Sequence, residues 1–155
     1  MNEKKRKVLS AVLICICIAT VAFIWGNSML DREASSNVSG SLLAAIEPII
    51  RLIGIESEGD RWLRKLAHFT EFGALGAELL FLAAVKGKLS LQAASNCAFA
   101  ALLVALTDET IQLASGRGSQ VTDVLLDFSG ALTGILIAWL ICLAIKRHHE
   151  KIKSN

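Results

Sequence analysis

Polar and ionisable residues gather in two short stretches of an otherwise apolar chain of 155 residues. The first stretch has a cation, an imidazole and a carboxylate at intervals of three residues, namely Lys65, His68 and Glu71. The second has four carboxylates, an amide and a guanidinium: Asp108, Glu109, Gln112, Arg117, Asp123 and Asp127. Carboxylates and imidazole can transfer protons or ligate metal ions, and the cations can bind phosphate or carboxylate groups. These residue types predict one site for proton transfer, ligand binding or both.

The residue types indicate three roles within such a site. The side chains suited to proton transfer are assigned as catalytic: His68, Glu71, Asp108 and Glu109. The side chains suited to holding a ligand by charge or hydrogen bonds are Lys65, Gln112, Arg117, Asp123 and Asp127. Hard carboxylate oxygens favour Mg²⁺, Ca²⁺ or Mn²⁺, so a divalent cation is placed on Glu109, Asp123 and Asp127. The sequence indicates no other cofactor.

The net charge of these residues is negative. The five carboxylates contribute −5 and the two cations +2, which leaves −3 when His68 is neutral. A site of low dielectric constant does not hold this charge without compensation. Some carboxylates therefore share protons, or a cation binds, or Arg61 and Arg64 turn into the site.

A simpler interpretation treats the same residues as unrelated charges at the ends of helices. Asp123 near the start of a helix fits that interpretation, because the helix dipole stabilises an anion there. Asp108 and Glu109 fit it only if their helix continues well beyond them, since a helix C-terminus disfavours carboxylates. Either that helix continues past Gln112, as far as Ala114, or the two carboxylates serve another purpose. We favour the shared site, because ionisable groups at membrane depth are costly and usually functional.

The elements that position these residues are predicted from four apolar runs in a chain that is 54% hydrophobic. They cover about residues 8–25, 66–85, 89–106 and 124–145. Runs of this kind span a bilayer as helices of about 20 residues. The fold class is thus all-α: a polytopic membrane protein with a bundle of four transmembrane helices, forming a single domain over residues 1–155.

The region between the first and second runs contains a shorter apolar pattern. Residues 42–54 place Leu42, Ile46, Ile49, Ile50 and Ile53 on one helical stripe. We expect an amphipathic helix that lies in the membrane interface within the first outer loop, because it is too short to span.

The first run itself resembles a signal peptide in its basic start. Its 18 apolar residues and the lack of a small-residue cleavage site favour a retained helix.

The distribution of Lys and Arg predicts the orientation. With four spans, ten of them lie on the side of the two termini and six on the other side. Both termini are therefore expected in the cytoplasm, and the polar residues of three helices are expected to meet just below the outer surface. The basic ends are topology signals, and the net charge of +2 gives no indication of nucleic-acid binding.

Several of these motifs in combination resemble the VanZ-like family. The likeness rests on "KLAHF" at 65–69, "DETIQ" at 108–112, Arg117 and "DVLLDFSGALTG" at 123–134, and it covers residues 65–134. The chain departs from the family pattern at Phe72, where Tyr is expected, and at Ser115, where Pro is common. Asp127 stands where Asn is common, which adds a negative charge and strengthens the expectation of a cation.

The resemblance implies a small multi-pass protein of the bacterial cytoplasmic membrane. The family's namesake accompanies glycopeptide-resistance genes and gives modest resistance to teicoplanin. Two classes of function follow. In one, the site binds or modifies a lipid-linked cell-wall precursor, as an enzyme or a binding site. In the other, a non-enzymatic membrane protein binds the antibiotic or a protein partner at the outer face. Substrate, catalysis, metal identity and oligomeric state stay open at this point.

Overall fold

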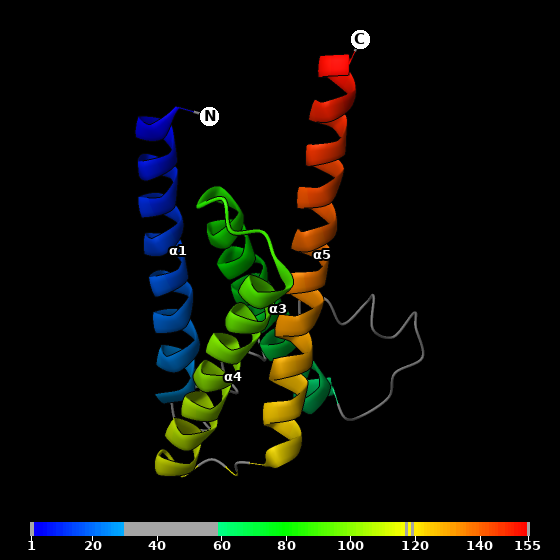
Figure 1. The fold of residues 1–155 in the computed structure, drawn as a ribbon. Coiled ribbons are helices and arrows are strands. Elements are labelled where there is room, and N and C mark those ends of the chain that lie inside the picture. Colours follow the sequence, from blue (N-terminus) through cyan, green and yellow to red (C-terminus); the bar gives the residue numbers. More distant parts are fainter. Residues whose placement is uncertain (1, 30–58, 117, 119, 155) are drawn as a thin grey trace.

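The computed structural model describes residues 2–29, 59–116, 118 and 120–154, which form four helices (Figure 1). These helices are α1 (Glu3–Met29), α3 (Gly59–Val85), α4 (Leu91–Ala114) and α5 (Val121–Ser154). Each contains a segment long and apolar enough to cross a membrane. The prediction of an all-α bundle with four spans is confirmed. The amphipathic helix expected over residues 42–54 lies outside the described residues.

The ends of the helices are set by local backbone chemistry. Ser90 precedes α4, and its side chain accepts a hydrogen bond from the backbone N–H of Ala93 at 3.2 Å. The helix ends at Ala114, and Gly116 follows with a φ of +75°, a conformation that favours glycine. The sequence left open whether this helix ends near Leu106 or continues to Ala114, and the structure shows that it continues. Asp108 therefore lies more than one turn inside α4.

The four helices alternate in direction along the bundle (Figure 1). One end, called here the termini end, carries the start of α1, the α3–α4 turn at residues 86–90 and the end of α5. The opposite end, called here the site end, carries the end of α1, the starts of α3 and α5, and the end of α4. Because α5 has 34 residues, at about 1.5 Å per residue it is longer than a bilayer is thick.

The closest helix packing joins α3 and α5 along a row of glycines. A Cβ atom at Gly130 would collide with the backbone carbonyl of Phe69, and one at Gly134 would collide with that of Gly73. Small residues let membrane helices approach until their backbones touch, which is how such helices associate without a hydrophobic drive. This contact fixes the separation of α3 and α5 close to the polar residues, since Phe69 directly follows His68 and Gly130 lies three residues after Asp127.

An apolar layer separates the polar residues from the rest of the bundle. Ile24, Phe72, Leu75, Ala101 and Ala105 are buried there and pack together. Phe72 is fully buried, so the apolar side chain at the position where the family pattern has Tyr belongs to this layer. The packing confines the polar site to one end of the bundle.

Candidate functional site

Asp108 on α4 is the centre of the polar site and is fully buried. Its Oδ1 accepts a hydrogen bond of 2.6 Å from the hydroxyl of Ser28 on α1. Its Oδ2 accepts one of 2.7 Å from the side-chain amide of Gln112, one turn further along α4. Both oxygens are thus oriented by neighbours, and hydrogen bonds to a charged acceptor are among the stronger ones in proteins.

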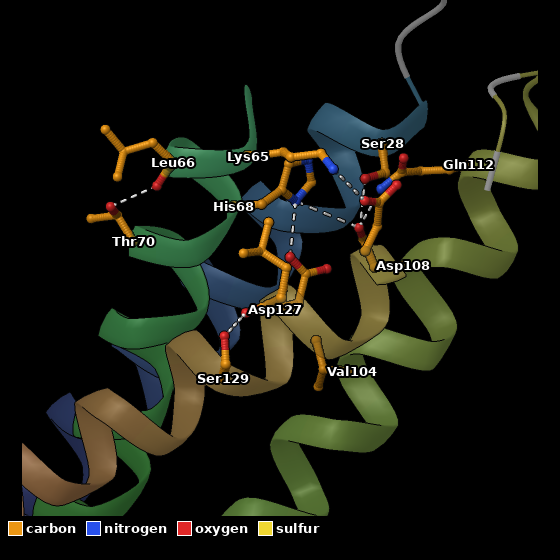
Figure 2. A network of polar contacts seen from close by, with 12 residues as sticks. Ser28, Lys65, Leu66, His68, Thr70, Val104, Asp108, Gln112, Asp127 and Ser129 are labelled. Atoms are coloured by element: carbon orange, nitrogen blue, oxygen red, sulfur yellow. Dashed lines mark hydrogen bonds and ion pairs between the residues drawn. The ribbon is translucent and has the colours of Figure 1, made fainter. Parts of the chain in front are cut away.

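His68 on α3 lies between two buried carboxylates from two other helices. Its Nδ1 is 3.9 Å from Oδ2 of Asp108 and 3.9 Å from Oδ1 of Asp127 on α5. Figure 2 shows the three side chains pointing toward one another. The separation exceeds the range of a direct hydrogen bond, which is about 2.7–3.2 Å. The three groups therefore surround a common point without bonding to each other.

A cavity of about 470 Å³ opens beside these residues at the site end. Its described lining comes from the starts of α3 and α5 and the end of α4, together with the connection between α4 and α5: Arg64, Lys65, His68, Glu109, Gln112, Gly118, Gln120, Asp123, Leu126 and Asp127. Lys65 forms an ion pair with Asp123 at 3.4 Å, and its side chain is about half exposed. The cavity thus combines accessible cations with buried acids.

The structure places most of the residues proposed from sequence around this cavity. Lys65, His68, Glu109, Gln112, Asp123 and Asp127 line it, and Asp108 lies directly behind His68 and Gln112. Arg64, one of the two arginines suggested as compensating charges, also lines it. Arg117 lies outside the described residues, so its role stays a prediction.

Glu71 takes a different position from the other predicted site residues. It is one turn deeper on α3, does not line the cavity, and accepts a hydrogen bond from the side chain of Asn27 on α1. The i, i+3 spacing from His68 places both residues on nearby faces, but the neighbouring helix decides their partners. Glu71 therefore connects α1 to the site and is not exposed to a ligand in the cavity.

The sequence interpretation missed the contribution of α1. Ser28 and Asn27 contact Asp108 and Glu71, and Ser28 is fully buried. Both follow directly after the apolar run, in "GNS" at 26–28. Ending the first span at Trp25 placed these residues in the outer loop. A polar triplet at the depth of the other site residues was the signal that could have identified them.

Among the described residues, one group has the geometry for holding a metal ion. Ligand atoms of His68, Asp108 and Asp127 all lie within 4.8 Å of one another. The set proposed from sequence was Glu109, Asp123 and Asp127, which shares only Asp127 with this group. Glu109 and Asp123 line the adjoining cavity, and their part in metal binding stays a prediction.

The comparison with protein families agrees with the geometry. The model of the VanZ/LLP1 family matches residues 8–142, which include all of α3 and α4, most of α1 and α5, and the residues of the polar site. The chain belongs to this family. It is a multi-pass membrane protein, and the resemblance inferred from residues 65–134 is confirmed and extends over most of the chain. No curated protein and no solved structure matches this VanZ/LLP1 protein.

Proposed function

We propose that this protein binds the anionic headgroup of a lipid-linked envelope precursor in the cavity at the site end. The observation that carries the proposal is the lining of that cavity, in which Arg64 and Lys65 accompany Gln112, Gln120 and Asp123. Guanidinium and ammonium groups bind phosphate oxygens, while amides and carboxylates bind hydroxyl and amide groups. A lipid-linked precursor carries all these groups on one headgroup.

The position of the cavity supports a ligand that resides in the membrane. Arg64 stands at the start of the membrane-spanning part of α3, and Asp123 stands in the first turn of α5. The cavity therefore lies at the boundary where headgroups meet the apolar chains of a bilayer. A lipid-linked headgroup can reach such a cavity while its chain stays among the helices' lipid-facing side chains.

The proposal requires the site end to face the outside of the cytoplasmic membrane, with both termini in the cytoplasm. The excess of Lys and Arg near the termini end supports this orientation. Single cysteines at Ser36 and at Lys88, each in a background without Cys15, Cys17, Cys97 and Cys142, test it with an impermeant thiol reagent. Labelling of the Ser36→Cys variant in intact cells is expected. Labelling of Lys88→Cys alone would reverse the orientation.

Ligand binding is tested with a polyprenyl pyrophosphate added to purified protein in detergent micelles. The probe is expected to raise the melting temperature, since a ligand that binds only the folded state stabilises it. The double variant Arg64→Gln with Lys65→Gln is expected to lose the shift. A control double variant, Lys86→Gln with Lys88→Gln, changes the same number of charges at the termini end and is expected to keep it. Equal shifts in both variants would refute the proposed site.

A second candidate function is binding of the glycopeptide antibiotic without any chemistry. Gln112 and Gln120 in the lining of the cavity favour it, because their amide groups can hydrogen-bond the peptide backbone of a glycopeptide. Teicoplanin in the same melting experiment is the corresponding probe. A shift with teicoplanin and none with the polyprenyl pyrophosphate would select this function over the first.

A resistance phenotype gives the cellular test of either function. Expression in a susceptible host is expected to raise the teicoplanin concentration needed to stop growth. Glu109→Gln removes a charge from the cavity at nearly constant side-chain size. This substitution and Arg117→Ala are each expected to abolish the resistance, while the amount of protein in the membrane stays nearly normal. Resistance that survives both substitutions would show that the cavity is not the functional part.

A further inference from the structure

The geometry points to a binding site for one divalent transition-metal ion held by His68, Asp108 and Asp127. The three ligands come from α3, α4 and α5, and they lie between the cavity and the apolar layer. The inference goes beyond headgroup binding and does not depend on it. It concerns the metal itself, whatever ligand enters the cavity.

The distances between the three groups favour a shared ion over direct contacts. Nδ1 of His68 is 3.9 Å from one oxygen of each aspartate, too long for hydrogen bonds. Ligand atoms that each bind a tetrahedral zinc at about 2.1 Å are about 3.4 Å apart. The two distances from His68 exceed this spacing by about 0.5 Å, and all three ligand atoms lie within 4.8 Å of one another. Binding of an ion therefore requires the three side chains to move closer together.

A buried oxygen of Asp127 provides a second, independent indication. Asp127 is 1% exposed, and its Oδ2 has no hydrogen-bond partner among the described residues. In Figure 2 this oxygen points toward Asp108. Leaving a buried carboxylate oxygen without a partner costs free energy, and two facing carboxylates repel each other. A divalent cation between them removes both costs and balances the charge of the pair.

The contacts of Asp108 match those that orient a metal ligand. Ser28 holds one of its oxygens and Gln112 the other, at 2.6 Å and 2.7 Å. Each oxygen keeps a further lone pair for an ion, and such outer contacts fix the ligand's direction in metal sites. Ser28 and Gln112 are therefore positioning residues, which explains why a buried serine at the end of α1 faces this carboxylate.

The combination of ligands selects the kind of ion. An imidazole nitrogen together with carboxylate oxygens suits Zn²⁺, Mn²⁺ or Fe²⁺, whereas Mg²⁺ and Ca²⁺ favour oxygen ligands throughout. Three protein ligands leave a coordination position open, and the cavity lies on the side from which water or a phosphate oxygen can fill it. Zn²⁺ and Mn²⁺ are the ions to test.

The experiment measures metal binding by the full-length chain, purified in detergent without a polyhistidine tag. The C-terminal residues His148 and His149 are changed to Gln beforehand, because they offer a separate metal-binding pair. After treatment with a chelator, Zn²⁺ or Mn²⁺ is added and the bound metal is measured by mass spectrometry and titration calorimetry. About one ion per chain is expected for one of these metals.

Three variants and one control decide the outcome. His68→Gln and Asp127→Asn keep the side-chain size and are expected to lower metal affinity more than about 100-fold, while Ser28→Ala lowers it about 10-fold. Glu150→Gln, which changes an exposed carboxylate at the termini end, is the control and is expected to retain the ion. Circular dichroism and gel filtration confirm that each variant is folded.

Two results would overturn the metal site. One is wild-type protein that binds neither ion in a stoichiometric amount. The other is folded His68→Gln and Asp127→Asn protein that binds as tightly as the wild type. Because no lipid probe is present in this assay, failure of the metal site is distinguishable from failure of headgroup binding.

Discussion

The two ends of the bundle carry charge in opposite ways. At the site end, Asp108 and Asp127 are buried; Asp108 accepts a hydrogen bond from Ser28 on α1, and Asp127 lies 3.9 Å from His68 on α3. At the termini end, charged pairs stay within one helix and are exposed. Glu3 pairs with Lys7 at 2.9 Å in α1, and Lys146 approaches Glu150 at 4.0 Å in α5. The buried acids at the site end thus link different helices, whereas the exposed pairs at the termini end join residues of one helix.

The cavities at the two ends show the same contrast. The one at the termini end has a volume of about 440 Å³, and its described charged lining is entirely basic: Arg6, Lys7, Lys86 and Lys88. The one at the site end combines cations with acids. Exposed basic residues beside spans are explained by topology, since Lys and Arg near the ends of spans favour the cytoplasmic side of a membrane. Buried acids shared by several helices have no topological purpose and therefore indicate a functional site.

The comparison predicts its largest effect for Asp108→Ala. The substitution leaves two donors, Ser28 and Gln112, without their acceptor. A buried donor without a partner costs about 1–3 kcal/mol, so the free energy of unfolding is expected to fall by about 3 kcal/mol or more. Denaturant unfolding in detergent micelles measures the change. A loss below about 1 kcal/mol would mean that the network does not connect the helices.

The next effect concerns the helix contact that brings the site together. Gly130→Ala places a methyl group against the carbonyl of Phe69, next to His68. Overpacking of this kind costs about 1–3 kcal/mol, and the shift of α5 is also expected to weaken ligand binding. Gly26→Ala is the control, because nothing lies within 4 Å of its added methyl group. Equal unfolding curves for the two variants would contradict the close α3–α5 contact.

A smaller effect is expected for Ser28→Ala. It removes one hydrogen bond to Asp108 and leaves the one from Gln112 in place. Hydrogen bonds to charged groups contribute about 1.5–3 kcal/mol, and the lower part of that range is expected in an unfolding measurement. Ser129→Ala is the control, since the Ser129 hydroxyl donates a hydrogen bond of 2.6 Å to the carbonyl of Leu126 in its own helix. Equal losses of unfolding free energy for the two substitutions would contradict the contribution of α1 to the site.

The smallest effect is expected at the termini end. Lys146→Gln or Glu150→Gln breaks a pair whose side chains are both more than 60% exposed. Exposed pairs within a helix contribute about 0.3–0.5 kcal/mol, and salt screens them. Thermal unfolding at low and high salt is expected to show almost no difference from the wild type. A loss as large as that of Ser28→Ala would erase the contrast between the two ends.

The sequence by itself determined the four helices and most of the polar residues that α3, α4 and α5 carry at the site end. Continuous apolar runs in lipid leave the backbone no hydrogen-bond partner outside the helix, so a helix is the only structure that such runs adopt as spans. The residue types in "KLAHF", "DETIQ" and "DVLLDFSGALTG" were also sufficient to identify the family. These features are local, because each depends on the residues of a single chain segment.

The tertiary structure decided which of these side chains meet. Spacing along a helix places Asp108 and Gln112 on one stripe, but only the rotation and depth of each helix determine what faces that stripe. The glycine contact between α3 and α5 sets His68 opposite Asp127, and α1 brings Ser28 to Asp108. Neighbouring residues such as Glu71 turn to other partners for the same reason. Contacts between helices depend on packing over the whole bundle, and no single segment carries that information.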